Sequence, residues 1–430
     1  AMRVRPTEHA VPGMVSGWRW AAALALVACL GFDAAVEASQ APRATQSWSF
    51  EMEGACVTSP LALRLPRRQT EEGDDDMVEL LVVGSNDGHV YSIHQSNGTL
   101  LWSRAVGSRV QSAPVATRSE DGSLQVLIAT ETGDVFGLDP ITGGKHWHMD
   151  LEDSVKGSPA LVAAPDGKST WAYYGAGHRV VAVDVWSGTV EDELDLSQHV
   201  VDLGVASSHG NRSLLLESSL ESSGDGWLFA ATMGGVLLRL QAFPRLRLDW
   251  QHSTGGFIDF QSAPTYVPEH GMVLVGGYSQ VMIAINASTG VDLWRSKAAD
   301  VVAQATFVPT MNAVLFGSSD QHVYAVDAGS GHLLWQHRFG FAVQSAPVVR
   351  MEQGGSLTIA VSGTSPRAGT GLRVLGLNKS GQQLWTVDTK AMVYAPVVWA
   401  RDECSLFVTG LDKFVRRVNV CSHHQVHDEL

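Results

Sequence analysis

One short pattern recurs along most of this chain, and the recurrence limits the folds that the chain can adopt. Between His322 and Val349 an alternating strand ends at an Asp, a turn with Gly follows, a Trp comes four residues after the Gly, and Ser-Ala-Pro leads into an apolar run. Related copies, about 45 residues apart, end at Trp102, Trp147, Trp294 and Trp385. Such a period is typical of propeller blades and much less so of the hairpins of a β-sandwich.

Each part of the pattern has a physical role. Alternating apolar and polar residues suit a strand with one face against its neighbour. Asp at the strand end can accept hydrogen bonds from the N–H groups of the turn, and Gly supplies positive φ there. The Trp can wedge between blades. Two copies depart from the pattern: one has Asp192 in place of the Trp, and the copy that ends at Trp250 lacks the Gly.

The skeleton resembles the pyrroloquinoline-quinone (PQQ) repeat, whose family pattern is A-x-D-x-x-T-G-x-x-x-W. The best matches are Ala325, Asp327, Gly331 and Trp335, followed by Ala182, Asp184 and Gly188. The resemblance covers nearly everything from Thr45 to Val420. It implies a β-propeller but no particular activity, because similar propellers occur in quinoprotein alcohol dehydrogenases, a bacterial outer-membrane assembly lipoprotein and the C-terminal part of a β-alanine-activating enzyme.

Counting the copies predicts how the ring closes. Eight outer-strand positions can be assigned, namely Trp48, Trp102, Trp147, Asp192, Trp250, Trp294, Trp335 and Trp385. The last copy has three strands, whereas Trp48 lies on an outer strand with no blade before it. We therefore predict an all-β, eight-bladed propeller over residues 42–421, with the N-terminal strand completing the last blade and removing the exposed edges.

The segments outside the repeats resemble targeting signals. Arg19, the apolar run from Trp20 to Phe32 and small residues near Ala38 predict a signal peptide within residues 1–41 that starts at Met14, and no membrane span after its cleavage. Residues 422–430 form an exposed tail that ends in the HDEL retention signal, His427, Asp428, Glu429 and Leu430. We expect a protein of the endoplasmic reticulum lumen that is bound by the HDEL receptor.

Covalent features fit that compartment. Cys404 and Cys421 flank a predicted hairpin in the last blade, so their ends should lie opposite each other and form a disulfide, with Cys56 free. Four N-x-S/T sequons are expected to accept glycans, at Asn97, Asn211, Asn286 and Asn378.

Several kinds of chemistry are not indicated. The net charge of -14 argues against nucleic acid, which requires a basic surface. By resemblance, a quinoprotein dehydrogenase would need a calcium-binding carboxylate cluster, a catalytic Asp and often a pair of adjacent cysteines, and the sequence has no Cys-Cys. H-E-x-x-H, G-x-S-x-G and P-loop motifs are also missing. We interpret Asp139, Asp184 and Asp327 as turn residues, and expect no catalytic residue, no metal and no cofactor.

The favoured function is a non-enzymatic binding or scaffold propeller that acts on a lumenal protein or glycoprotein. A PQQ-dependent dehydrogenase stays open, as does the propeller piece of a multidomain acyl-activating enzyme, although the two terminal signals argue against the latter. A polar ring at the channel mouth is a candidate site, with mutual hydrogen bonding or bound water as the simpler interpretation. It comprises Gln111, Lys156, Gln261, Gln304 and Gln344.

The two faces of the ring should differ. All four sequons, the acidic loop from Glu71 to Asp76 and the tail fall on the face of the first-to-second and third-to-fourth turns. Glycans are bulky and solvated, so that face should not be a tight interface. The opposite face, with Asp87 and Asp320 in second-to-third turns, is the predicted partner face.

Overall fold

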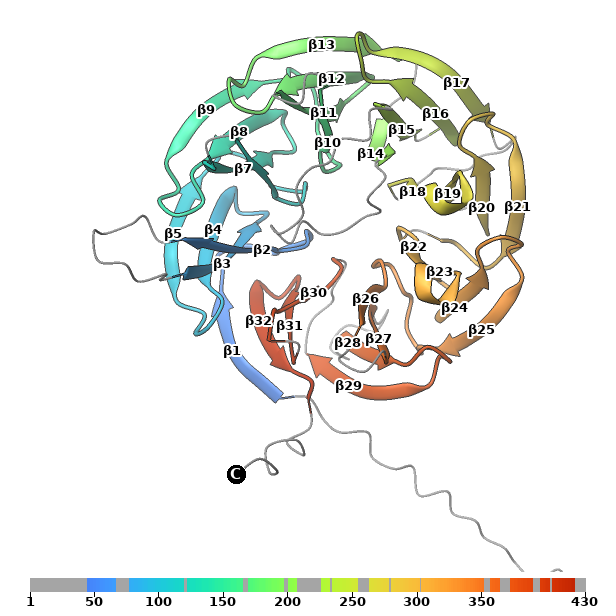
Figure 1. Ribbon diagram of the computed structural model, residues 1–430. Helices are drawn as coiled ribbons and strands as arrows, with labels where there is room; N and C mark the ends of the chain where they lie inside the picture. The colour runs from blue at the N-terminus through green and yellow to red at the C-terminus, as the bar shows by residue number, and fades with distance from the viewer. Residues whose placement is uncertain are drawn as a thin grey trace, which may run out of the picture. The chain divides into compact units, whose positions relative to one another are not determined.

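The computed structural model describes residues 45–421 except 67–76, 120–121, 165–168, 197–199, 207–225, 233, 254–262, 278–279, 302, 352–355, 364–371, 390–394 and 403. The chain divides into Ala1–Gln40, which lies outside the described residues, and Ala41–Leu430, which contains every element below. Within the described residues, the strands form eight four-stranded antiparallel sheets arranged as blades around one axis (Figure 1). The predicted all-β, eight-bladed propeller is confirmed.

Blades 1 to 4 follow the chain from the axis outward. Their strands are β2 (Leu61–Pro66), β3 (Met77–Gly84), β4 (His89–His94) and β5 (Leu100–Ala105); β6 (Val115–Arg118), β7 (Leu124–Ala129), β8 (Asp134–Leu138) and β9 (Lys145–Asp150); β10 (Ala160–Ala163), β11 (Thr170–Ala176), β12 (Arg179–Asp184) and β13 (Val190–Asp195); β14 (Val200–Ala206), β15 (Trp227–Thr232), β16 (Val236–Gln241) and β17 (Arg247–Ser253).

Blades 5 to 7 repeat this order, and two short 3-10 helices replace the first turns of blades 5 and 6. The elements are β18 (Thr265–Val267), η1 (Pro268–His270), β19 (Met272–Gly276), β20 (Val281–Asn286) and β21 (Asp292–Lys297); β22 (Thr306–Val308), η2 (Pro309–Met311), β23 (Ala313–Gly317), β24 (His322–Asp327) and β25 (Leu333–Arg338); β26 (Val348–Met351), β27 (Leu357–Gly363), β28 (Leu372–Leu377) and β29 (Gln383–Thr389). No helix in the described part of the chain is long and apolar enough to cross a membrane.

Blade 8 joins the two ends of the chain. It consists of β30 (Val398–Trp399), β31 (Ser405–Thr409), β32 (Phe414–Asn419) and, on the outside, β1 (Thr45–Glu51). β1 pairs antiparallel with β32, which sets Trp48 opposite Arg417. Figure 1 shows the blue β1 beside the red β32. The N-terminal strand therefore completes the last blade, as the sequence predicted.

The core lies between blades. The two middle strands of the blades are almost wholly buried, and their side chains form clusters that bridge neighbouring blades, such as Phe229 and Leu237 of blade 4 with Val273 and Ile283 of blade 5. The outermost strands instead alternate between exposed and half-buried residues, as in β5, β9, β13 and β25. Burial of the middle strands of all blades holds the ring together, because the hydrophobic effect scales with the apolar area removed from water.

Six of the outer tryptophans each link one blade to the next. Trp48 of blade 8 lies against Gly98 in the third-to-fourth turn of blade 1, and a Cβ on that Gly would lie 2.6 Å from the indole. Its Nε1 donates a hydrogen bond of 3.0 Å to the carbonyl of Gln95 in the same turn. The same pair of contacts joins Trp102 to Gly143, Trp147 to Gly188, Trp250 to Gly290, Trp294 to Gly331 and Trp335 to Gly381. These glycines also have positive φ, so two constraints favour Gly there.

The two departures from the repeat meet at one interface. Blade 3 has Asp192 in place of the Trp, and the facing turn of blade 4 has Phe243, Pro244 and Arg245 instead of a Gly turn. Oδ2 of Asp192 accepts a hydrogen bond of 2.6 Å from the backbone N–H of Leu246 at the end of that turn. A carboxylate reaching a backbone donor thus replaces an indole lying on a glycine.

We predict that Trp294→Ala and Gly331→Ala are not additive. Trp294 is buried, so its truncation should cost about 3 kcal/mol of unfolding free energy. Gly331→Ala should lower the unfolding free energy because the new Cβ would clash with the indole. In the Trp294→Ala background the same substitution should lower it less. The coupling energy should reach about 1 kcal/mol, measured by denaturant unfolding of the double-mutant cycle. The control pairs Gly331→Ala with the distant Trp147→Ala; equal coupling in both cycles would contradict the contact.

Candidate functional site

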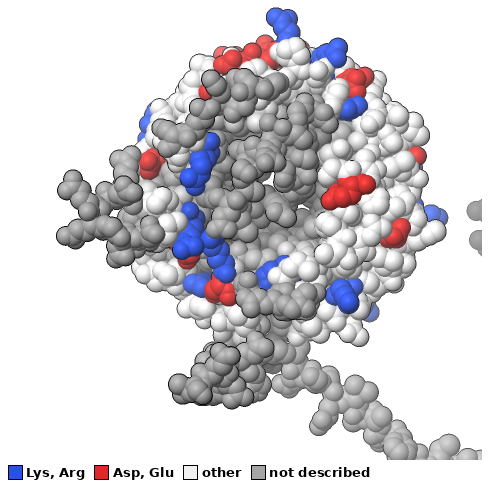
Figure 2. All heavy atoms as spheres, in the orientation of Figure 1, with Lys and Arg blue, Asp and Glu red and all other residues white. Residues whose placement is uncertain are grey.

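A hollow of about 410 Å³ opens between blades 8 and 1, where the ring closes. Its lining comes from both blades and comprises Arg64, Glu79, Gln95, Ala400, Arg401, Asp402 and Arg417. Figure 2 shows Lys and Arg side chains gathered on the inner part of the visible face, toward these two blades. A basic hollow stands out on a chain whose net charge is -14.

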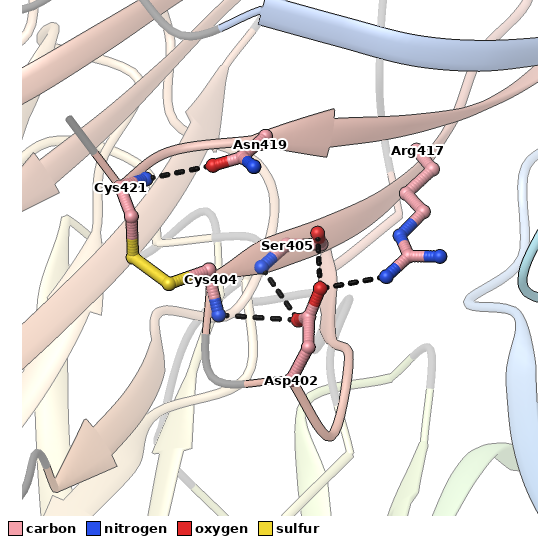
Figure 3. Close-up of a disulfide and its surroundings, with 6 residues drawn as sticks. All are labelled: Asp402, Cys404, Ser405, Arg417, Asn419 and Cys421. Carbon is pink, nitrogen blue, oxygen red and sulfur yellow. Dashed lines mark hydrogen bonds and ion pairs between the residues drawn. A yellow bond between two sulfur atoms is a disulfide. The ribbon is translucent and has the colours of Figure 1, made fainter. Parts of the chain in front are cut away.

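Asp402 and Arg417 in the lining of the hollow are bonded to each other. Oδ1 of Asp402 accepts hydrogen bonds from the backbone N–H groups of Cys404 and Ser405, at 3.1 and 2.9 Å. Oδ2 accepts from Ser405 Oγ and Arg417 Nη2, each at 2.6 Å (Figure 3). Burial alone would raise the pKa of Asp402, but these donors outweigh it and hold the pKa below its ordinary value. The carboxylate is therefore ionised at neutral pH.

The same arginine reaches across the seam. Nη1 of Arg417 donates to the backbone carbonyl of Gln95 in blade 1, at 3.0 Å. Gln95 is itself buried, and its Nε2 donates to the carbonyls of Leu63 and Leu80. Arg64 and Glu79 complete the lining as a loose, half-exposed pair at 4.0 Å. Because most of its polar groups bind one another, the hollow primarily braces blade 8 against blade 1; its lining contains no hydroxyl or thiol nucleophile.

The predicted disulfide lies beside this hollow. Cys404 and Cys421 are bonded, with their Cα atoms 5.1 Å apart (Figure 3). The bond joins the start of β31 to the end of β32 in the one blade whose third and fourth strands are not consecutive in the chain. Cys56 is free and buried, and burial raises the pKa of its thiol.

The turn aspartates act as the sequence predicted. Oδ1 of Asp139 accepts from the N–H groups of Ile141 and Thr142. Asp184 accepts in the same way from Trp186 and Ser187, and Asp327 from Ser330. Their carboxylates are used in turn formation. No group of three or more His, Cys, Asp and Glu side chains within the described ranges could hold a metal.

The residues of the candidate polar ring hold one position in their repeats. Gln111, Lys156, Gln304 and Gln344 precede the innermost strands of blades 2, 3, 6 and 7. The glutamines are half-buried and Lys156 is exposed. Gln261 lies outside the described residues. Equivalent positions in the repeat are thus retained, and the polar ring at the channel mouth stays a prediction.

Asp87 and Asp320, expected on the partner face, both accept hydrogen bonds within their own blades. Asp87 accepts hydrogen bonds from the N–H of His89 and the hydroxyl of Tyr91, at 2.8 and 2.9 Å. Asp320 accepts from His322 and Tyr324 in the same way, at 3.0 and 2.5 Å. Burial, helped by the Asp87 carboxylate, raises the pKa of Tyr91 to about 12, so its hydroxyl remains a donor. These carboxylates therefore bind their own turns, and their place on a partner face stays a prediction.

Two positively charged side chains on that face are more exposed than these carboxylates. The side chain of Arg109 is 63% exposed and lies 3.9 Å from the carboxylate of Glu131. Lys156 is exposed as well. Their loops bond to second-to-third turns, through Glu131 N–H to the Arg109 carbonyl and Gly177 N–H to the Ser154 carbonyl.

Three of the four sequon asparagines lie within the described residues. Asn97 is exposed and its Oδ1 accepts from its own sequon residue, Thr99. Asn286 and Asn378 are half-buried, and each Oδ1 accepts two hydrogen bonds from backbone N–H groups of its turn. Asn211, the acidic loop from Glu71 to Asp76 and the tetrapeptide from His427 to Leu430 lie outside the described residues.

Sequence reasoning missed the bond from Arg417 to Asp402. The two residues are separated by 15 positions and a hairpin, and no spacing rule connects them. The consecutive Arg416 and Arg417 were the available signal, since neighbours on a strand point to opposite faces. Arg416 bonds to Asp412 at the other side, which leaves Arg417 for the seam.

Comparisons with known proteins agree with the fold. The model of a family described as outer membrane protein assembly factor BamB matches residues 33–203 and 179–393. BamB from Moraxella catarrhalis is 16% identical, with a TM-score of 0.61 over 90% of this chain and 100% of that one. Sqt1 from Saccharomyces cerevisiae is 12% identical, with a TM-score of 0.66 over 89% and 100%. The computationally designed Ika8 protein is 14% identical, with a TM-score of 0.59 over 86% and 98%. No curated protein matches the sequence.

We predict that the disulfide stabilises the closing blade. Cys404→Ser with Cys421→Ser should lower the unfolding free energy by about 2–4 kcal/mol, because the bond restricts the unfolded chain. A non-reducing peptide map should show the Cys404–Cys421 pair, and Cys56→Ala is the control that should preserve it. Finding Cys56 bonded to either of the others would overturn the assignment.

Proposed function

The chain belongs to the PQQ-repeat β-propeller family whose model is described as outer membrane protein assembly factor BamB, and from that premise we propose that it is a non-enzymatic, protein-binding propeller. The observation that carries the proposal is the use of its recurring carboxylates. Asp139, Asp184 and Asp327 each bond to the turn that they begin. The repeats therefore supply a rigid ring with variable loops, which suits binding of another macromolecule.

The surface proposed for the partner is the face of the second-to-third turns. Its backbone is braced by paired contacts such as Tyr91 to Asp87 and Tyr324 to Asp320. A braced loop loses little entropy when it binds a partner. Arg109 and Lys156 supply exposed positive charge on this face, which favours an acidic protein or glycoprotein.

The proposed compartment is the endoplasmic reticulum lumen. Three features support it together: the signal-like run before residue 42, the four sequons, and the tetrapeptide His427-Asp428-Glu429-Leu430. The disulfide adds to them, because such bonds persist in oxidising compartments. The HDEL receptor is accordingly a proposed partner of the tail.

We expect lumenal retention to depend on the last residue. Deletion of Leu430 should release the protein from expressing cells into the medium, because the receptor reads the complete tetrapeptide. Immunoblots of cells and medium measure this, with Val426→Ala as the control that should stay inside. An intact chain that remains cytosolic and unglycosylated would contradict the compartment.

Partner binding should depend on one face only. Arg109→Glu with Lys156→Glu should remove the proteins crosslinked to the wild-type chain in the lumen, while sparing the turn hydrogen bonds. Asn97→Asp with Asn378→Asp, on the opposite face, is the matched control and should leave them bound. Quantitative mass spectrometry of the crosslinked proteins reads out both; loss with the control and not with the charge reversals would reverse the assignment of faces.

A further inference from the structure

Exposed aliphatic side chains gather at one place in the blades. Apart from Met351, every large exposed hydrophobic residue in the described ranges lies on an outermost strand or one residue before it. We call those of blades 1, 5, 6 and 7 the aliphatic rim: Leu100 and Leu101, Val291 and Leu293, Leu333 and Leu334, and Leu384. Val291 is 61% exposed and Leu333 54%. Apolar groups that recur at the same position of several blades require an explanation, whereas isolated ones do not.

The rim coincides with the sequons in three blades, whereas Val190 and Leu248 are exposed on the outer strands of blades 3 and 4 without a sequon in the preceding turn. The residue just before the outer-strand Trp is Leu in the four blades of the aliphatic rim, and three of them carry a sequon in the preceding turn, at Asn97, Asn286 and Asn378. The other four blades have His146, Glu191, Asp249 or Ser47 at that position, and none has a sequon in that turn. Blade 6 is the exception, because Leu334 follows a turn that reads Asp327-Ala328-Gly329.

The geometry brings acceptor and rim together. The backbone N–H of Asn286 donates to the carbonyl of Val291 across the turn, at 2.7 Å. Asn378 bonds in the same way to Gln382, two residues before Leu384, and Asn97 lies three residues before Leu100. A sugar attached to any of these amides begins beside the exposed aliphatic groups. Pyranose rings carry C–H faces that can cover such groups, and their hydroxyls face water.

We propose that N-linked carbohydrate at Asn97, Asn286 and Asn378 covers the aliphatic rim of blades 1, 5 and 7 and leaves Leu333 and Leu334 of blade 6 bare. The inference rests on the proposed entry into the secretory pathway. It assigns the glycans a physical task, namely to keep water-exposed leucines from associating with other chains.

The chain offers variants that remove a sugar and keep the turn. Asn286→Asp places at this position the residue that blades 2, 3 and 6 use to accept the same turn bonds. Ser288→Ala destroys the same sequon without a change of charge, because the backbone N–H of Ser288, and not its hydroxyl, bonds to Asn286. Agreement between the two variants separates loss of the sugar from the added charge.

The readout is retention of the purified, glycosylated protein on a phenyl matrix, with site occupancy measured by mass spectrometry. Both variants should be retained longer than the wild type, and adding Leu293→Gln to either should restore wild-type retention. The reverse experiment is Asp327→Asn with Gly329→Ser, which gives blade 6 the Asn-Ala-Ser of blade 5. It should acquire a glycan and elute earlier, and Leu334→Gln should then have little further effect.

The outcomes distinguish this inference from the proposed compartment. If Asn286 carries a glycan and its removal by both variants leaves retention unchanged, the inference is wrong and the compartment stands. If the purified wild-type chain carries no glycan at Asn97, Asn286 or Asn378, the inference is wrong, and the deletion of Leu430 decides the compartment separately. Longer retention that Leu293→Gln does not reverse would also overturn the inference, because the newly exposed surface would lie elsewhere.

Discussion

The contact of an indole ring with the backbone of the next blade's turn is the interaction on which the ring depends. It needs a large flat side chain on one blade, a residue without Cβ on the next, and a carbonyl that can accept from Nε1. Trp294, Gly331 and the carbonyl of Ala328 show all three. The Trp and the Gly of one repeat therefore belong to two different interfaces, and a change in one repeat must be matched in its neighbour. The joint departure at Asp192 and the turn before Leu246 follows this rule.

Closure poses a separate problem, because blade 8 has no hairpin between its third and fourth strands. Pairing of β1 with β32 supplies the backbone hydrogen bonds. Trp48 packs on Gly98 of blade 1 just as five other outer indoles pack on a Gly in the turn of the following blade. Arg417 adds a side-chain link from blade 8 to Gln95 of blade 1, and the Cys404–Cys421 bond holds the end of β32. Several interactions of different kinds thus replace one covalent turn, and β1 covers the edge that β32 would otherwise expose at the seam.

The aspartates described above accept hydrogen bonds from groups of the same chain. The turn aspartates bind their own loops, and Asp87, Asp320 and Asp402 accept from tyrosine, backbone or arginine donors. These bonds give each of the carboxylates a structural role. The features from which we propose functions lie on the surface. They are the exposed cations on one face and the aliphatic groups beside sequons at the rim of the other.

The sequence by itself determined the alternating strands, the Asp turns and the disulfide pair, because each depends on residues close in the chain. It also determined the number of blades and the closing strand, because these follow from counting the repeats. Only the tertiary structure showed three sets of hydrogen bonds. Asp192 accepts from the backbone N–H of Leu246, and Arg417 donates to Asp402 and Gln95. Tyrosine hydroxyls donate to Asp87 and Asp320. The sequence does not distinguish a turn Asp whose carboxylate faces water from one that accepts from a tyrosine hydroxyl. The assignment of Asp87 and Asp320 to a partner face stays a prediction. These contacts form because the closed ring brings certain side chains within hydrogen-bond distance. A local sequence pattern does not give the distance between residues that are far apart in the chain.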